Sequence, residues 1–92
     1  MKADNALPAR LPVVDDRRWA RISWRCRRGM LENDIVLTRY LEASDRRLAE
    51  PEIEALDRLL DKNDNALWDL LSGRADSDDE EVQRLVCKLR SL

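Results

Sequence analysis

The residues whose types and spacing could support a specific interaction lie together between Arg28 and Asp34. Gly29 is one of only two glycines in the 92 residues, and a glycine readily takes the left-handed backbone conformation that ends one helix before another begins. Glu32 follows three residues later and falls in the first turn of the next expected helix, where free N–H groups and the helix dipole favour a carboxylate. This pattern fits either a simple helix corner with an N-terminal charge or a surface that binds a partner.

Catalysis by the chain itself is not expected from its composition. The sequence contains no histidine, the commonest general base, and no nucleotide-binding loop, dinucleotide fingerprint or catalytic triad. Two cysteines without histidine make a poor zinc site, because zinc normally takes four ligands. A chain of 92 residues also buries only about 60 to 65% of its unfolded surface, which leaves little room for a catalytic cavity. We therefore expect a binding protein without a metal, and not an enzyme.

Charge is distributed unevenly along the chain. The formal net charge of −2 gives no overall reason to bind nucleic acid or an acidic membrane. Six arginines nevertheless crowd one segment and five acids crowd another, namely Arg17, Arg18, Arg21, Arg25, Arg27 and Arg28 against Asp76, Asp78, Asp79, Glu80 and Glu81. Such asymmetry indicates a polar contact surface. No stretch approaches the roughly 20 apolar residues of a membrane span, and we expect a soluble protein of a reducing compartment.

The hydrophobic pattern predicts an all-α fold, a compact five-helix bundle with a mobile N-terminal tail. Residues 1–14 contain Pro8 and Pro12 and no helical period, and they form the expected tail. Residues 15–92 form a single domain, in which apolar residues recur at helical spacing. The expected helices cover Asp16 to Arg28, Leu31 to Glu42, Pro51 to Asp61 or Lys62, a short segment between Asp64 and Gly73, and Ser77 to Arg90.

The first expected helix has an inward stripe and a tryptophan outside it. Apolar residues recur at spacings of three and four at Trp19, Ile22, Cys26 and Met30. Trp24 lies to one side of this stripe, among the arginines, and is expected either to pack against a neighbouring segment or to contact a partner. Cys26 is expected to be a small buried hydrophobe rather than a reactive thiol.

The second expected helix is apolar around nearly its whole circumference, which is typical of a helix at the centre of its bundle. Its apolar residues are Leu31, Ile35, Val36, Leu37, Tyr40 and Leu41. Glu32 and Arg39 lie two turns apart on its least apolar side. Glu32 is therefore expected at the surface beside the arginines of the first helix, where an ion pair with Arg28 is the simplest alternative to a role in binding.

Capping residues mark the remaining helix ends. Pro51 suits a first turn, Asp64 suits the N-cap of the short fourth helix, and Ser77 with Glu80 forms a capping box. Acids at the start of the last helix also suit its dipole, which gives the acidic segment a structural explanation. Cys87 lies on or beside the apolar stripe of that helix and is expected in the core.

A strong resemblance to a known family starts at the string Arg27-Arg28-Gly29-Met30-Leu31-Glu32-Asn33. This string resembles the Arg-Gly-x-x-Glu motif of the SdhE-type flavinylation factors, the succinate dehydrogenase assembly factor family. Upstream, Arg21-Ile22-Ser23-Trp24 and Cys26 resemble the leading helix of that family, and downstream the segment from Leu59 to Gly73 resembles its second characteristic block. Together these blocks cover Arg17 to Leu92 in the order that the family has.

The resemblance implies a small five-helix assembly chaperone that promotes covalent attachment of FAD to the flavoprotein subunit of succinate dehydrogenase, and in some bacteria to that of fumarate reductase. In that family the flavin bond forms on a histidine of the client, so this chain would bind no cofactor stably and the client would carry FAD. It implies no nucleic-acid or membrane partner. Carried over by position, the client interface would comprise Arg28, Gly29, Met30, Glu32, Asn33 and Asp34, flanked by Arg21 and Trp24.

Two other functions fit part of the pattern. A DNA-binding helix-turn-helix would place arginines before a glycine turn and a second helix, but that second helix is apolar where a recognition helix needs polar residues that contact bases. A subunit-interface module of another complex would use the same surface. For a flavinylation factor of this kind, we expect the bacterial cytoplasm rather than the mitochondrial matrix.

Overall fold

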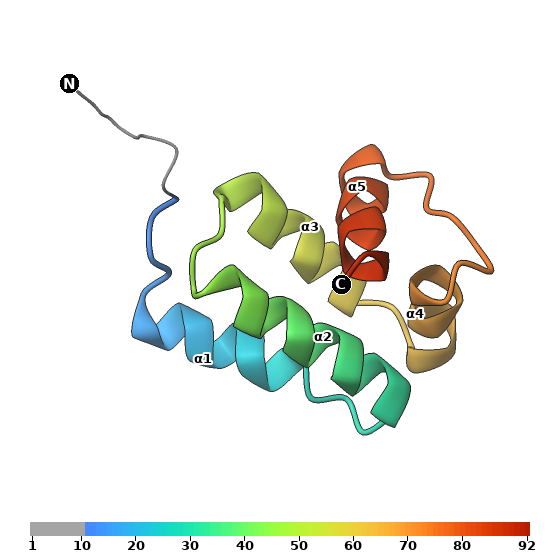
Figure 1. Ribbon diagram of the computed structural model, residues 1–92, viewed down its shortest axis with the longest axis horizontal. Helices are drawn as coiled ribbons and strands as arrows, with labels where there is room; N and C mark the ends of the chain where they lie inside the picture. The colour runs from blue at the N-terminus through green and yellow to red at the C-terminus, as the bar shows by residue number, and fades with distance from the viewer. Residues whose placement is uncertain (1–10) are drawn as a thin grey trace.

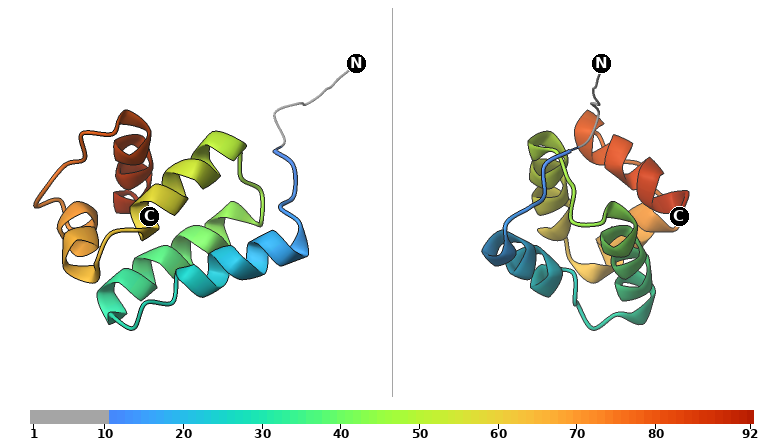
Figure 2. Two further views of the ribbon diagram at one scale, coloured as in Figure 1. Left: turned by 180° about the vertical axis from the view of Figure 1, so that it is seen from behind. Right: turned by 60° about the vertical axis from the view of Figure 1, so that its left-hand side comes forward.

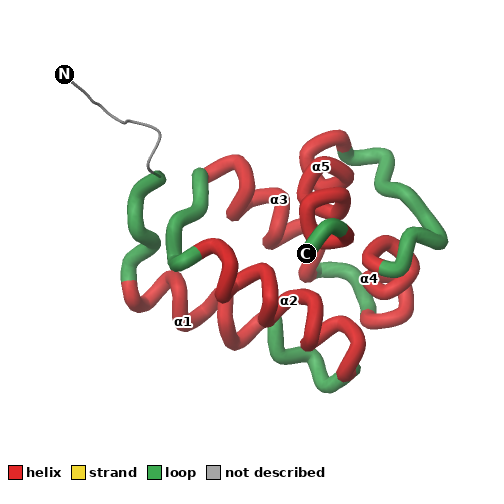
Figure 3. The backbone as a smooth tube through the Cα atoms, viewed as in Figure 1, coloured by secondary structure: helices red, strands yellow, loops and turns green. Residues whose placement is uncertain are grey.

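The structure, a computed structural model, describes residues 11–92, which form helices joined by short connections (Figure 1). In chain order these are α1 (Asp16–Arg25), α2 (Leu31–Ser44), α3 (Glu50–Leu60), α4 (Asp64–Leu71) and α5 (Glu80–Arg90). Figure 3 shows helices and connections but no strand in this part of the chain, where the only β-pairing is an isolated bridge between Val13 and Arg47. The expected all-α, five-helix bundle is therefore confirmed for residues 11–92.

The core lies where four of the helices meet. In Figures 1 and 2, α1 and α2 run side by side in opposite directions, α3 packs against α5, and α4 closes one end against α2 and α5. The apolar side chains with no solvent exposure come from these four helices, α2 to α5: Leu37, Leu56, Leu59, Leu67 and Val86. Each buried leucine of this kind contributes roughly 1.5 to 3 kcal/mol to folding. Helix α1 joins the core through Ile22 and through Cys26, the residue directly after its end, which are 3% and 2% exposed.

Ion pairs set the position of α1 along α3. Arg18 binds Glu50 with a shortest N–O distance of 2.5 Å, and Arg25 binds Asp57 and Asp61 at 3.0 and 2.7 Å. The hydrogen bond from Arg18 lowers the pKa of the Glu50 carboxyl and raises the pKa of the Arg18 guanidinium. Because these groups remain in contact with solvent, the pairs orient α1 more than they stabilise the fold.

Two helix ends differ from the sequence-based boundaries because of contacts between segments. Helix α1 ends at Arg25, three residues before the expected Arg28, because the backbone N–H of Arg28 binds a side chain of α2. Helix α2 continues to Ser44, two residues beyond the expected Glu42, and stops where Asp45 turns into the left-handed region.

Two N-caps were assigned to the wrong neighbour. Asn63 caps α4 by accepting the Ala66 N–H at 2.9 Å, so Asp64 is the first helical residue instead. Asp79 caps α5, while the hydroxyl of Ser77 accepts the N–H of Asp79 at 3.1 Å. Because Ser, Asp and Asn are nearly equal as N-caps, the pattern located these helix starts only to within one or two residues.

The chain before α1 joins the fold earlier than expected. The predicted tail spans residues 1–14, of which residues 1–10 lie outside the described part of the chain. Residues 11–14 lie along the α2–α3 connection, where the Val14 N–H donates to the Arg46 carbonyl at 2.7 Å and Arg47 donates to the Leu11 carbonyl at 2.8 Å. Val14 is 6% exposed and belongs to the core. In the sequence, Val13 and Val14 directly after Pro12 were the available signal for this short extended segment.

Cys87, expected in the core, is exposed. Helix α5 buries Val82, Leu85, Val86 and Leu89. These four side chains already fill the face of α5 that contacts the other helices, and Cys87 follows Val86 by 100° around the helix. This turn carries its thiol out of the stripe, so the sequence-based placement was wrong.

The α2–α3 connection contains two left-handed residues that are not glycine. Asp45 has a φ of 51° and Arg46 a φ of 61°. Arg46 is held there by hydrogen bonds to the Val14 carbonyl and to Asp16, and its guanidinium lies 5.9 Å from the centre of the Trp19 ring. No hydrogen bond from the Asp45 side chain to a described residue offsets the unfavourable backbone there. This position therefore carries strain that a glycine would relieve.

Replacing Asp45 by glycine is expected to raise the free energy of unfolding by about 0.5 to 1 kcal/mol, because glycine takes the left-handed conformation without a Cβ clash. Urea denaturation followed by circular dichroism measures the change. The matched control is Glu42→Gly, an exposed position inside α2, where glycine should lower stability by about 1 kcal/mol. A loss of stability in both variants would contradict the assignment of strain to Asp45.

Candidate functional site

Gly29 lies at the outer bend of the linker that joins α1 to α2. Its φ of +95° is in the left-handed region, as the sequence predicted. It does not directly follow the end of α1, however, since Cys26, Arg27 and Arg28 intervene. A Cβ built on Gly29 would have nothing within 4 Å. The backbone at this corner is therefore accessible, and a partner can approach it closely.

Asp34 holds the linker from within α2. Its Oδ1 accepts the Arg28 N–H at 2.8 Å and its Oδ2 accepts the Gly29 N–H at 3.2 Å. The N-cap residue of α2, Met30, offers no side-chain hydrogen bond of its own. Asp34 thus fixes the peptide groups before the helix, in the way that a capping-box acid does from a nearby position. It is half-buried, and its carboxylate points toward the linker.

The side chain of Arg28 points inward rather than toward a partner. Its Nε–H donates to Asp64 Oδ1 at 2.6 Å, and its terminal nitrogens donate to the carbonyl oxygens of Leu60 and Lys62 at 2.8 and 2.5 Å. These two carbonyls lie at the end of α3 and just beyond it, where a helix leaves acceptors without an internal partner. The side chain is only 17% exposed. The sequence suggested an ion pair between Arg28 and Glu32, but Arg28 pairs with Asp64 instead.

Asn33 is in the core, although the sequence placed it beside the motif surface. Its side chain has no solvent exposure. The amide nitrogen donates to the Asp64 carbonyl at 3.1 Å and lies 3.4 Å from the sulfur of Met30, which is half-buried. Arg28, Asn33 and Asp34 therefore form an internal hydrogen-bond network with Asp64, which we call the linker network. It joins α2, α4 and the α1–α2 linker.

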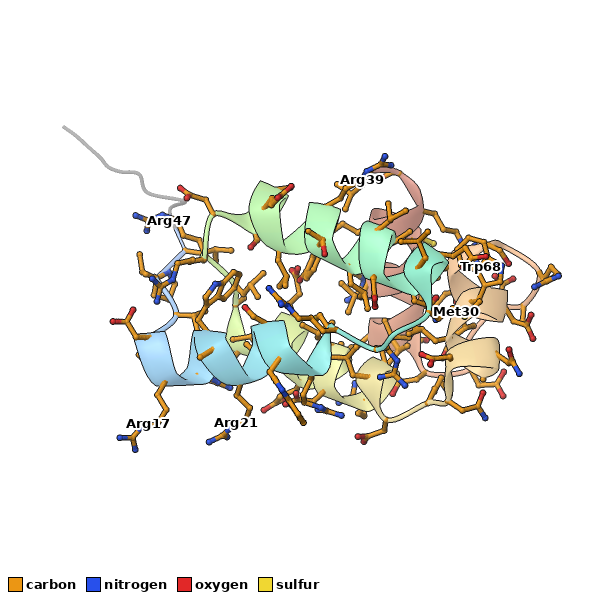
Figure 4. The ribbon with its side chains drawn as sticks, turned by 90° about the horizontal axis from the view of Figure 1, so that it is seen from below. Arg17, Arg21, Met30, Arg39, Arg47 and Trp68 are labelled. Carbon is orange, nitrogen blue, oxygen red and sulfur yellow. The ribbon has the colours of Figure 1, made fainter. Side chains whose placement is uncertain are left out.

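The remaining predicted residues lie at the surface. Glu32 is exposed in the first turn of α2, and Trp24 is 76% exposed near the end of α1. Trp24 lines a shallow depression together with Arg25, Arg27, Arg28 and Asp64. Arg21 is exposed one turn earlier and projects away from α2 on the same side as Arg17 (Figure 4). The expectation that Trp24 leaves the inward stripe is confirmed.

Two exposed apolar residues on α2 were missed. Leu31 is 67% exposed and Ile35 is 42% exposed, although the sequence predicted a central helix covered on most sides. Helix α2 buries Asn33, Leu37 and Tyr40 on the opposite side. At 100° per residue, Leu31 and Ile35 lie within 40° of each other and at least 120° from Leu37 and Tyr40, so the helical angle held the missing signal. A helix with two apolar faces does not reveal which one is buried.

The two cysteines differ in environment. Cys26 is buried, and burial raises the pKa of its thiol to about 11, against the opposing effect of the nearby charges of Arg25 and Arg28. The expectation that Cys26 is an unreactive core residue is consistent with this burial. No group of three or more potential metal ligands occurs within residues 11–92.

A comparison with family models assigns the chain. The model described as "Flavinator of succinate dehydrogenase" matches residues 20–92, which include the linker, the linker network and all five described helices except the first four residues of α1. The chain belongs to this family.

Relatives within the flavinator family cover most of the chain. The FAD assembly factor SdhE of Coxiella burnetii is 40% identical over 72 residues, which are 78% of this chain and 88% of that protein. The factors of the same name from Methylococcus capsulatus and Ralstonia nicotianae are 42% and 41% identical over 72 and 82 residues, which are 87% and 86% of those proteins and 78% and 85% of this chain. No solved structure matches this one.

For this member of the flavinator family, we expect a thiol reagent such as DTNB to modify Cys87 rapidly and Cys26 only on unfolding. Cys87 is exposed, whereas Cys26 is buried and has a pKa of about 11. Mass spectrometry of the native protein at neutral pH measures which thiol is labelled. The Cys87→Ser variant is the control, since it should take up no reagent until denaturant is added. Rapid labelling of that variant would contradict the buried position of Cys26.

Replacing Arg28 by alanine is expected to lower the free energy of unfolding by about 2 kcal/mol, because it removes three hydrogen bonds from a charged donor and leaves α3 carbonyls unpaired. Urea denaturation measures the loss. The adjacent exposed Arg27 provides a matched control, and Arg27→Ala should change stability by less than about 0.5 kcal/mol. Equal effects of the two substitutions would show that Arg28 has no special structural role.

Proposed function

We propose that this chain promotes covalent attachment of FAD to the flavoprotein subunit of succinate dehydrogenase by docking on that subunit through Gly29 and Glu32, with Arg21 and Trp24 beside them. Membership of the flavinator family and the similarity to FAD assembly factors support the general activity. The surface itself is argued from the positions of these four residues. Arg28, Asn33 and Asp34 belong to the same motif region but act from inside the fold.

The observation that carries this proposal is that two motif residues are exposed while three neighbours hold them in place. Open space surrounds the Cβ position of Gly29, and Glu32 projects from the first turn of α2. Asp34 fixes the two peptide groups at the corner, so the surface requires little ordering when a partner binds. A preorganised surface keeps more of its contact energy as affinity. A carboxylate at its centre favours a partner with a complementary positive group.

In the proposed mechanism the chain acts by positioning, not by proton transfer. It contains no histidine, and the carboxylate of Asp64, which lines the shallow depression beside Trp24, is bound by Arg28. FAD remains with the client, whose own histidine forms the bond to the flavin. Docking holds the client's FAD-binding domain so that these two groups stay within reacting distance, and such proximity alone accelerates a reaction strongly.

The same surface would serve the flavoprotein subunit of fumarate reductase, which we include as a second possible client. We place the activity in the cytoplasm of a bacterium, as the named relatives are bacterial proteins. None of the helices described here is long and apolar enough to cross a bilayer. The DNA-binding alternative has no support from the comparisons, and Arg18, Arg25 and Arg28 are already engaged by carboxylates within the fold.

The test is covalent flavin in the succinate dehydrogenase flavoprotein subunit, measured as in-gel fluorescence after denaturation in cells that lack the gene for this chain. Wild type should restore the signal. Glu32→Ala should reduce it at least about tenfold, because a charge central to an interface commonly contributes more than 1.4 kcal/mol. Gly29→Arg should abolish it by blocking close approach.

Two controls separate docking from folding. Glu54→Ala removes another exposed carboxylate, on α3, and should restore the signal as wild type does. Circular dichroism should still show a folded helical protein for Gly29→Arg, because the Cβ meets no atom within 4 Å, although a side chain at the left-handed φ of +95° lowers stability. Equal covalent flavin with Glu32→Ala and with wild type would contradict the proposed surface. Equal flavin in every strain, the strain without the gene included, would contradict the function.

A further inference from the structure

The outer face of α2 has the pattern of a helix that packs against another helix. Leu31, Ile35, Thr38 and Glu42 are all exposed and follow each other at spacings of four, three and four residues. This alternation is the spacing of the central seam in a coiled coil. Leu31 and Ile35 supply apolar contacts over the first half of the seam. Since the opposite face of α2 is buried in the core, the outer face lacks a covering element among the described residues.

Two opposite charges flank this seam on one edge. Glu32 follows Leu31 and Arg39 follows Thr38, so the two occupy equivalent positions one heptad, or about 10 Å, apart. Arg39 projects outward from α2 in Figure 4. The ion pairs between residues 11 and 92 include neither Glu32 nor Arg39. Both charges are therefore available to a partner.

This arrangement is self-complementary for one geometry only. When two identical helices pack antiparallel about a two-fold axis, equivalent edge positions one heptad apart face each other across the interface. With the axis between Ile35 and Thr38, Glu32 of each copy faces Arg39 of the other, and each Ile35 packs against Thr38 of the other copy near the centre. A parallel pair would instead set each of these edge positions against the other edge of the partner helix, so Glu32 and Arg39 would not face each other.

We propose that the outer face of α2 binds a second copy of this chain, with the two α2 helices antiparallel and two Glu32–Arg39 ion pairs between them. The small size of the face sets the strength of this association. A helix of 14 residues is about 21 Å long and about 10 Å wide. One such face is far smaller than the roughly 800 Å² per partner of a stable interface. The dimer is therefore weak and forms at high protein concentration.

The dimer also regulates docking, an inference that rests on the proposed function. Glu32 belongs to the proposed client surface and to the proposed dimer interface, so a chain bound to its own copy cannot bind the flavoprotein through that residue. The weak dimer is then a reserve form, which dissociates when a client with higher affinity is present.

Sedimentation velocity of the purified full chain, from low micromolar to near-millimolar concentration and without any client, tests the dimer directly. Wild type should shift from monomer to dimer across this range. Arg39→Glu and Glu32→Arg should each raise the dissociation constant at least about tenfold, because each replaces two attractive pairs by two repulsive ones. The double variant should restore association to within about threefold of wild type, since it exchanges the charges and keeps the pairing.

Arg17→Glu makes the same change in charge on the outer side of α1, away from the seam, and should leave the dissociation constant unchanged. Ile35→Asp should abolish association while circular dichroism remains native. A wild type that stays monomeric up to the highest concentration would overturn the proposal. So would a double variant that associates no better than the single ones, because the face would then bind something other than its own copy.

Cells that carry Arg39→Glu complete the test, because Arg39 is not part of the proposed client surface. These cells should attach flavin to the client at least as well as wild type. Loss of covalent flavin with Arg39→Glu would overturn regulation by the dimer and assign this face to the client instead. If Glu32→Ala attaches flavin normally, the proposed client surface fails, but the charge-exchange result in sedimentation still decides whether the dimer exists.

Discussion

The guanidinium group of Arg28 is the contact on which the arrangement of the motif depends. It binds atoms of Leu60, Lys62 and Asp64, which lie 32 to 36 residues away in the sequence. One side chain thereby ends α3, joins the start of α4 and fixes the linker between α1 and α2. A lysine could not replace it, because only the planar guanidinium offers several donors in fixed directions. The arginine of the motif works inside the fold, while its glycine and glutamate face solvent.

Much of the fold follows from local sequence, and the errors arise where distant contacts decide. The helical repeat, Pro51 in a first turn, Gly73 beyond α4 and Glu32 in the first turn of α2 depend on neighbours within a few residues, and the sequence contains these signals. The roles of Asn33 and Asp34 depend on Asp64 and on the peptide groups of the linker, which no local pattern shows. Polar residues in a motif suggested surface exposure, yet Asn33 is fully buried and Asp34 is half-buried.

The candidate site was predicted in part for the same reason. Gly29, Glu32, Arg21 and Trp24 are exposed, as a contact surface requires, because each lacks a place in the helical stripe that fills the core. Leu31 and Ile35 were missed because apolar character indicates burial without indicating a direction. In α1, the spacing of the arginines indicates their roles better than their number does. Arg18 and Arg25 face α3, while Arg17 and Arg21 face away from it.

The anchoring of Leu11 to Val14 has a consequence for chains of different length. These residues are fastened to the α2–α3 connection, beside the beginning of α1, whereas Gly29 follows the end of α1 (Figure 1). The ten residues of α1 separate the two points by about 15 Å along the helix. Whatever precedes residue 11 is attached on the far side of the helix from the motif. A tag or domain fused before residue 11 therefore starts from the opposite end of α1, with the whole helix between its point of attachment and the corner at Gly29.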